Sequence, residues 1–258
     1  MNQNIITLGM IEIRWYSVLI LIAFMIGALI IFYGAKRKQI DTRLISDLIF
    51  YLIITVIIGA RIYYVLFNLD YYLKYPIDII KIWEGGLAIH GGIIAGIIFL
   101  YYYCKKKKID LLTITDIIAP ALILGQAIGR WGNFFNQEAY GSITTYEALK
   151  HLHIPNFIIS GMYINHSYWH PTFFYESIMC LIGFIIIFIY CNIKKCRKGH
   201  LTALYFIIYG IIRFFIESMR QDSLMIGSIK MAQIVSIIMI LIGIGIFIYS
   251  FKKEKYDK

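Results

Sequence analysis

The sequence predicts an all-α integral membrane protein with seven transmembrane helices, and three observations support this class. The chain has 258 residues, of which 60% are hydrophobic, well above the share in soluble domains. The apolar residues gather in stretches long enough to cross a bilayer. The formal net charge is +10, but the basic residues lie in short runs between those stretches. This distribution indicates a membrane topology and not a nucleic-acid partner.

The apolar stretches cover residues 15–35, 45–67, 87–104, 112–133, 171–193, 201–219 and 231–251. The first has no basic segment before it and no small-residue cleavage site, and Lys36-Arg37-Lys38 follows it. We therefore expect a retained helix and not a removed signal peptide. No internal repeat or low-complexity linker interrupts the chain. Residues 1–258 are predicted to form a single polytopic membrane domain.

Sixteen of the twenty-five basic residues fall in every second connection between the apolar stretches. They are Lys36, Arg37, Lys38, Arg43, Lys105 to Lys108, Lys194, Lys195, Arg197, Lys198, Lys252, Lys253, Lys255 and Lys258. By the positive-inside rule these connections are cytoplasmic, so we expect the N-terminus outside and the C-terminus inside.

The connections assigned to the outside differ in composition. Residues 68–86 are aromatic and mixed in charge, with Pro76 breaking any helix and Gly85-Gly86 before the third stretch. The longest connection, about residues 136–170, is rich in Tyr, His, Asn and Ser. It is too polar to span a membrane and is predicted to form a small outer head.

On this topology the titratable residues within or beside a span, apart from those of the inner loops, fall in the outer half of the membrane. They are Tyr16, Arg61, His90, Arg130, His170, Tyr175, Glu176, Arg213, Glu217 and Arg220. An arginine near a bilayer interior costs about 2.5–3.5 kcal/mol on insertion scales, so it needs a partner, a water-filled cavity or an anionic ligand. The segregation of these residues predicts a functional site.

Arg130 lies among glycines and aromatic residues at the end of the fourth stretch, and Arg213, Glu217 and Arg220 share one helical face. The alternatives are an arginine that snorkels to the headgroups and a structural ion-pair network. Surplus arginine donors beside glycines suit a phosphate, because the guanidinium stays charged and offers a planar fork of donors. A lipid phosphate is the anion most available at this depth.

Other candidate sites are weaker. His90 precedes Gly91-Gly92 and is either a general base or a hydrogen-bonded structural residue. His166 and His170 have a zinc-like spacing, but Pro171 interrupts a helix there and no third ligand is obvious. The four cysteines form no CxxC pair and are expected to be reduced. We expect no metal and no cofactor.

The chain resembles the bacterial prolipoprotein diacylglyceryl transferases. The family signature Gly-Arg-x-Gly-Asn-Phe-x-Asn-x-Glu-x-x-Gly stands in full at 129–141. Further matches follow in family order: Trp15-Tyr16, Gly59-Ala60-Arg61, Trp83-Glu84-Gly85-Gly86, His90-Gly91-Gly92, Asp116 with Ala119-Pro120, His170-Pro171 with Tyr175-Glu176, and Tyr209-Gly210 with Arg213, Glu217 and Arg220. Two departures are Phe173, where the family often has Gln, and Arg220-Gln221-Asp222, which lacks the usual proline. They affect the expected peptide contacts and loop geometry.

The resemblance implies transfer of a diacylglyceryl group from phosphatidylglycerol to the lipobox cysteine of a preprolipoprotein, forming a thioether and releasing glycerol phosphate. It implies a multi-pass protein of the bacterial inner membrane, among membrane lipids, whose active site faces the outer leaflet. The expected catalytic residues are His90, Arg130, Arg213, Glu138 and Tyr16, with His90 the first candidate for the base and Tyr16 the second. The expected substrate-binding residues are Arg130, Asn133, Asn136, Gly141, Arg61, Glu176, Glu217 and Arg220.

Two other classes of membrane protein are alternatives. A lipid flippase would also gather arginines at membrane depth, but it needs polar residues through both leaflets, and the inner halves of these stretches are almost purely apolar. A receptor-like seven-span protein would have no use for so many ionisable groups in the outer half.

Overall fold

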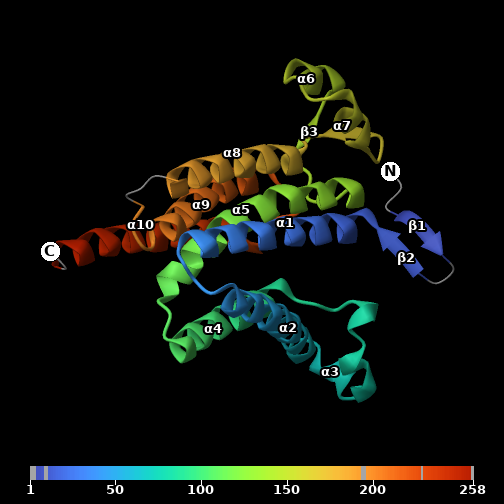
Figure 1. Cartoon of the computed structure of the whole chain (residues 1–258). Coiled ribbons are helices and arrows are strands. Elements are labelled where there is room, and N and C mark those ends of the chain that lie inside the picture. Colours follow the sequence, from blue (N-terminus) through green and yellow to red (C-terminus); the bar gives the residue numbers. More distant parts are fainter. Residues whose placement is uncertain (1–3, 9–10, 193–195, 228, 257–258) are drawn as a thin grey trace. The chain divides into compact units, whose positions relative to one another are not determined.

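A computed structural model describes residues 4–8, 11–192, 196–227 and 229–256 (Figure 1). Its contacts divide the chain into two compact units, which are considered separately. The first unit comprises Met1–Ile31 and Thr115–Lys258, and the second comprises Phe32–Ile114. The described residues do not include the end of the predicted span 171–193. They also exclude Lys194, Lys195 and Lys258, three of the basic residues used to predict the orientation.

Most of the described chain is helical. The helices are α1 (Trp15–Arg37), α2 (Thr42–Leu66), α3 (Leu69–Tyr72), α4 (Ile89–Lys107), α5 (Leu111–Asn136), α6 (Tyr146–His151), α7 (Asn156–Gly161), α8 (Thr172–Asn192), α9 (His200–Met219) and α10 (Met231–Tyr256), with the short 3-10 turns η1 (Pro76–Ile80) and η2 (Ile82–Glu84). The strands are β1 (Asn4–Leu8), β2 (Ile11–Arg14), β3 (Ile143–Thr144), β4 (Tyr163–Ile164), β5 (Ser167–Trp169), β6 (Met225–Ile226) and β7 (Ile229–Lys230).

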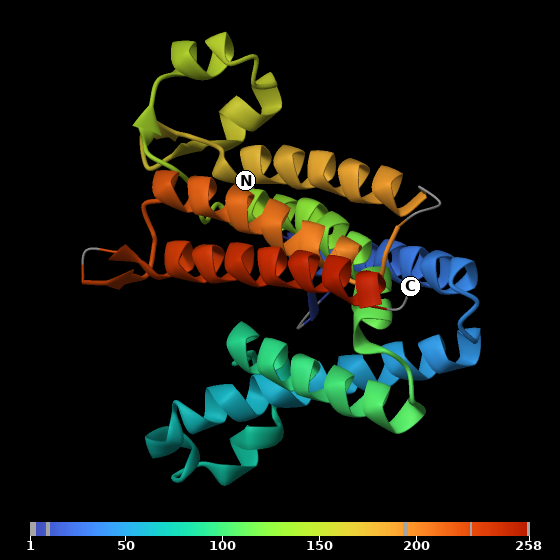
Figure 2. The same ribbon diagram turned by 90° about the vertical axis from the view of Figure 1, so that its left-hand side faces the viewer.

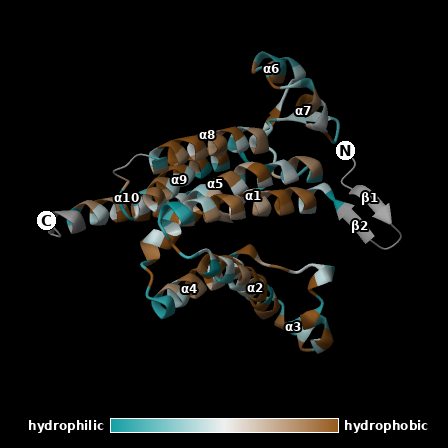
Figure 3. Cartoon of the chain, viewed as in Figure 1, coloured by the Kyte–Doolittle hydropathy of each residue, from teal (hydrophilic) through white to brown (hydrophobic). Residues whose placement is uncertain are grey.

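Six of these helices, α1, α2, α5, α8, α9 and α10, are long and apolar enough to cross a membrane. In Figure 3 they are coloured as hydrophobic over most of their length. The prediction of an all-α membrane protein is confirmed. The predicted third span is also a helix, α4, but His90 and the terminal Lys105, Lys106 and Lys107 make it more polar. A seventh crossing stays a prediction.

The first unit is a bundle in which α9 packs against α8 and α10, as the turned view in Figure 2 shows. One core cluster joins α5, α8 and α9 and consists of Ala119, Ile123, Ala127, Cys180, Ile187, Leu201, Ile212 and Ile216. Asp116, near the N-terminal end of α5, is fully buried. Its carboxylate accepts hydrogen bonds from the backbone N–H groups of Gly199 and Thr202 at 2.8 and 2.9 Å. Asp116 thus caps the start of α9. It is an exception to the prediction that the titratable residues of the spans lie in the outer half of the membrane, since it is near the start of α5, at the end opposite Arg130.

The segment predicted to form a head contains α6, α7 and a small antiparallel sheet. The strand order is β3-β5-β4, with Ile143 opposite Trp169 and Tyr163 opposite Tyr168. Its apolar core consists of Leu149, Ile154, Ile158, Ile159 and Met162, together with Phe134 of α5 and Phe173 of α8. The end of α5 is therefore held from both sides, by the bundle and by this small subdomain.

The second unit is built on the pairing of α2 with α4. Their backbones approach closely where Gly59 faces Gly91, since a Cβ added to Gly59 would lie 2.8 Å from the Gly91 carbonyl oxygen. Small residues at such a contact let two helices pack through dispersion forces in lipid, where the hydrophobic effect cannot drive association. The connector from α2 to α4 contains α3, η1 and η2 and has little regular structure.

Candidate anion-binding site

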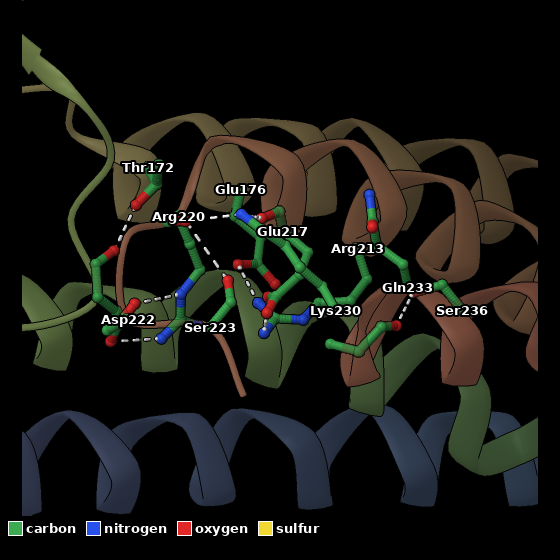
Figure 4. Close-up of polar contacts among 12 residues, drawn as sticks. Thr172, Glu176, Arg213, Glu217, Arg220, Asp222, Ser223, Lys230, Gln233 and Ser236 are labelled. Carbon is green, nitrogen blue, oxygen red and sulfur yellow. Dashed lines mark hydrogen bonds and ion pairs between the residues drawn. The ribbon is translucent and has the colours of Figure 1, made fainter. Parts of the chain in front are cut away.

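Two arginines and two glutamates meet in the first unit, and Figure 4 shows three of them, Arg213, Glu176 and Glu217. Arg130 Nη2 lies 2.8 Å from Glu176 Oε1, and Arg213 lies 3.4 Å from Glu176 Oε2 and 2.5 Å from Glu217 Oε2. The Glu176 side chain is only 2% exposed, whereas those of Arg130 and Arg213 are 20% and 16% exposed. Glu176 therefore holds both arginines from the buried side.

The helices place these groups by simple periodicity. Arg213 and Glu217 are four residues apart on α9 and face the same side. Tyr209, one turn earlier on the same face, has its hydroxyl 3.5 Å from both Arg130 Nη2 and Glu176 Oε1. Sequence analysis gave Tyr209 no role, although its spacing of four residues from Arg213 could have indicated one. What the sequence could not show is that Arg130 and Glu176, from different helices, meet here.

The signature is shaped by the way α5 ends. Gln137 has a left-handed φ of 52°, its N–H donates to the Phe134 carbonyl, and the Glu138 N–H donates to the Asn133 carbonyl. This bonding pattern is the Schellman motif, which reverses the chain at a helix end. The reversal returns the Glu138 carboxylate to Asn133 Nδ2 at 2.9 Å and to Asn136 Nδ2 at 3.2 Å. Asn133 Oδ1 in turn lies 3.4 Å from Arg130 Nη1, so the turn is linked to the arginine.

The two arginines keep hydrogen-bonding capacity. A guanidinium carries five N–H donors. Within the described residues, Arg130 bonds through Nη1 and Nη2 to Asn133, Glu176 and Tyr209, and Arg213 bonds through Nη1 and Nη2 to Glu176 and Glu217. Neither Nε makes a bond there. Three of these contacts, at 3.4–3.5 Å, are long and easily exchanged. The cluster can therefore bind an anion without losing its short ion pairs.

Two glycines of the signature are needed for packing. A Cβ on Gly132 would lie 2.3 Å from the Tyr16 ring, so this glycine lets Tyr16 of α1 lie directly on α5. Tyr16 remains exposed. A Cβ on Gly141 would lie 2.9 Å from His170 Cβ, and the Gly141 N–H donates to the His170 carbonyl at 2.9 Å. Gly141 thus joins the end of the signature to the residues that precede α8.

Beyond α9, Arg220 forms a paired contact with Asp222, through Nε at 2.9 Å and Nη2 at 2.8 Å. The hydrogen bond from Arg220 holds the pKa of Asp222 below its ordinary value. Lys230 Nζ donates to the carbonyls of Glu217, Ser218 and Arg220 at 2.8, 3.1 and 2.7 Å (Figure 4). Lys230 was not predicted as a site residue, because a single lysine before an apolar stretch has no distinctive pattern. It fixes the last turn of the helix that carries Arg213 and Glu217.

Arg61 and His90 belong to the second unit. Arg61 is 7% exposed, and its guanidinium bonds to backbone carbonyls of the connector. His90 is the second residue of α4 and is exposed, with its ring centroid 6.2 Å from that of Tyr63. The structure thus gathers Arg130, Arg213, Glu176 and Glu217 in one cluster, with Asn133 linking Glu138 to it, and places Arg61 and His90 in the other unit.

The predicted zinc alternative gains nothing from the geometry. His170 Nδ1 lies 3.1 Å from the Tyr175 hydroxyl, and burial lowers the pKa of His170. His166 is exposed in a left-handed turn. Across the described ranges, no three His, Cys, Asp or Glu side chains gather in a way that could hold a metal ion.

The fold and this cluster define a polytopic membrane protein with an ion-pair cluster of two arginines and two glutamates among its helices. The family model described as prolipoprotein diacylglyceryl transferase matches residues 3–249. Proteins named phosphatidylglycerol–prolipoprotein diacylglyceryl transferase are similar to this chain. Those of Staphylococcus saprophyticus, Staphylococcus aureus and Listeria monocytogenes are 47%, 46% and 45% identical to it over 251, 252 and 244 residues. The alignments cover 95–97% of this chain and 88–89% of those proteins. The chain belongs to the prolipoprotein diacylglyceryl transferase family.

Proposed function

We propose that this protein transfers the diacylglyceryl group of phosphatidylglycerol to the lipobox cysteine thiol of preprolipoproteins. Family membership and the names of the relatives support this function. The observation that carries the mechanism is the cluster of Arg130 and Arg213 on Glu176, with N–H donors left over. The products are a thioether-linked diacylglyceryl cysteine and glycerol phosphate.

The arginine cluster suits the charge that develops in this reaction. The thiol sulfur attacks the glycerol carbon, and the bond from that carbon to the phosphate oxygen breaks. The phosphate then goes from one negative charge towards two. Arg130 and Arg213, fixed by Glu176 and Glu217 in a water-poor site, therefore stabilise the transition state more than the bound lipid. Donors already in place at the start of the reaction need no reorganisation.

A base must remove the thiol proton, because a free cysteine thiol has a pKa of about 8.5 and little thiolate at neutral pH. His90 is our proposed base and accepts this proton as the sulfur–carbon bond forms, and Tyr16 is the second candidate. Asn133 and Glu138 are proposed to orient Arg130 through the contacts at the end of α5. Substrate contacts by Arg61, Asn136, Gly141, Glu176, Glu217 and Arg220 remain proposals, and each is testable by substitution.

We propose that α4 supplies a seventh crossing and that the chain forms one integral domain. The N-terminus would be outside, the C-terminus cytoplasmic, and the head and active site at the outer leaflet of the bacterial inner membrane. The basic residues beside α1 and α4 support this orientation, since positive charges are retained on the cytoplasmic side.

Purified protein with labelled phosphatidylglycerol and a lipobox peptide tests the activity directly. Labelled peptide and released glycerol phosphate in equal amounts are expected, and no transfer by folded protein would contradict the proposal.

His90→Gln should lower turnover by about 10²–10⁴-fold, the usual contribution of a general base. The defect should shrink as the pH rises towards the pKa of the free thiol, where thiolate forms without a base. A pH-independent defect with lost lipid binding would exclude His90 as base and favour Tyr16.

A further inference from the structure

We propose that Arg61 is a positioning residue, which folds the connector between α2 and α4 around its guanidinium and thereby fixes the start of α4 with His90. The inference deepens the proposed function, on which its catalytic part rests. Its structural part concerns only the second unit and can be tested without any activity.

Every N–H group of Arg61 is used by the connector. Nε donates to the carbonyl of Ile79 at 2.9 Å, and Nη1 donates to those of Gly85 and Gly86 at 2.8 and 2.9 Å. Nη2 donates to the carbonyls of Asp78 at 2.5 Å and Lys81 at 3.5 Å. An arginine has five N–H donors, and these five bonds account for all of them. No donor remains for a phosphate while the connector keeps this fold.

These bonds replace secondary structure. Residues 76–86 of the connector have only the short 3-10 turns η1 and η2. The backbone bonds described there reach the carbonyls of Asp78 and Lys81 but not those of Ile79, Gly85 and Gly86. Buried carbonyl groups without partners are costly, and one guanidinium supplies the missing donors. The nearby carboxylate of Asp78 is occupied elsewhere, by Lys81 Nζ at 2.6 Å and the Tyr71 hydroxyl at 2.7 Å. The hydrogen bonds of Arg61 therefore go to backbone carbonyls and not to a carboxylate.

The side chain is also enclosed. The guanidinium carbon lies 5.3 Å from the centre of the Tyr72 ring and 5.9 Å from that of Tyr64, which is cation–π geometry. Gly86 has a φ of 74°, and a Cβ there would lie 2.5 Å from Arg61 Nη1. The absence of a side chain at Gly86 thus leaves room for the Arg61 guanidinium.

The contacts lead directly to His90. Arg61 bonds to the carbonyls of Gly85 and Gly86. The residue before it on α2 is Ala60, whose carbonyl accepts the Ala88 N–H at 3.1 Å. Helix α4 then begins at Ile89. Two consecutive residues of α2 therefore fix the last turn before His90. A displacement of about 1 Å at a reacting group can cost about 10²-fold in rate.

The test compares Arg61→Lys with Arg43→Lys, an exposed control, and Gly86→Ala with Gly245→Ala on α10, whose added methyl would meet no atom within 4 Å. Lysine has three donors and cannot reach all five carbonyls. Measurements are amide hydrogen exchange over residues 76–88, affinity for phosphatidylglycerol, and turnover. For Arg61→Lys and Gly86→Ala we expect exchange about tenfold faster or more, turnover lower by about 10²-fold, and lipid affinity within about twofold of wild type.

Loss of lipid affinity with unchanged exchange would overturn the inference and make Arg61 a headgroup ligand. Faster exchange with normal turnover would also overturn it, because the connector would then not position His90. Failure of the wild-type protein to transfer lipid would contradict the proposed function but leave the exchange result readable.

Discussion

The two units contain arginines that are stabilised in opposite ways, Arg61 being buried and Arg130 and Arg213 partly buried. Arg61 gives all five N–H donors to backbone carbonyls and has no carboxylate partner among the described residues. Arg130 and Arg213 share the carboxylate of Glu176 and keep donors unused. A buried arginine is thus not by itself a sign of an anion site. The partners of the arginine distinguish the two cases. Backbone carbonyls use all the donors of Arg61, whereas the long contacts of Arg130 and Arg213 leave donors for the anion in the proposed function.

The largest effect is expected from removing the carboxylate that the two arginines share. Glu176→Gln leaves two partly buried arginines with one remaining carboxylate, Glu217, and breaking a buried pair costs up to about 3–5 kcal/mol. The midpoint of thermal unfolding in detergent should fall clearly below that of Glu147→Gln, an exposed control on α6. Equal midpoints for the two variants would show that the cluster contributes no stability.

Arg130→Lys should lower turnover by about 10²–10³-fold, the cost of removing one fixed donor from a charged transition state. Lysine keeps the charge but loses the planar fork. Thermal unfolding should stay near wild type, because the ammonium can still pair with Glu176. Amide hydrogen exchange over residues 76–88 should stay unchanged in Arg130→Lys, whereas we expect it to become faster in Arg61→Lys. Normal turnover in Arg130→Lys would reduce this residue to a structural role.

A smaller effect is expected at Tyr209, whose hydroxyl bridges Arg130 and Glu176. Tyr209→Phe removes two long hydrogen bonds, worth about 0.5–1.5 kcal/mol, and should lower turnover by up to about tenfold. Tyr205→Phe is the matched control, because the Tyr205 hydroxyl contacts Gln126 and neither arginine. If both variants lose activity equally, ring packing and not the hydroxyl contact is responsible.

The smallest effect concerns the pair of Arg220 and Asp222, in which the carboxylate is exposed. Arg220 lowers the pKa of Asp222, so the pair stabilises the fold above the ordinary aspartate pKa, and this contribution is lost as the pH falls through the lowered value. Asp222 is 51% exposed, so the contribution should be under about 1 kcal/mol. The difference between the unfolding midpoints of wild type and Asp222→Asn should shrink over the range from about pH 4, the ordinary aspartate pKa, down to the lowered pKa. A constant difference across that range would contradict the assignment.

Much of the fold followed from the sequence because spanning helices are specified by length and apolarity. The predicted span 112–133 is α5, Leu111–Asn136, and the spacing of Arg213 and Glu217 placed both on one face. The meeting of Arg130 with Glu176 depends on how helices pack, which periodicity does not encode. The fixation of Arg61 could not be predicted, since its partners are carbonyls that every residue possesses. Asp116 was matched to the family but given no role, because a helix cap from a distant helix leaves no local pattern.

The division of the chain also bears on the order in which its parts can assemble. Phe32–Ile114 is one continuous segment, whereas the other unit joins Met1–Ile31 to Thr115–Lys258. Synthesis delivers the N-terminus first, and compact units fold as they become complete. The pairing of α2 with α4 can therefore finish while ribosomes are still making α5. The beginning of α1 must wait in the bilayer until Gly132 arrives to pack against Tyr16. The cluster of Arg130, Glu176, Arg213 and Glu217 can form only after α9 has been made, later than the second unit.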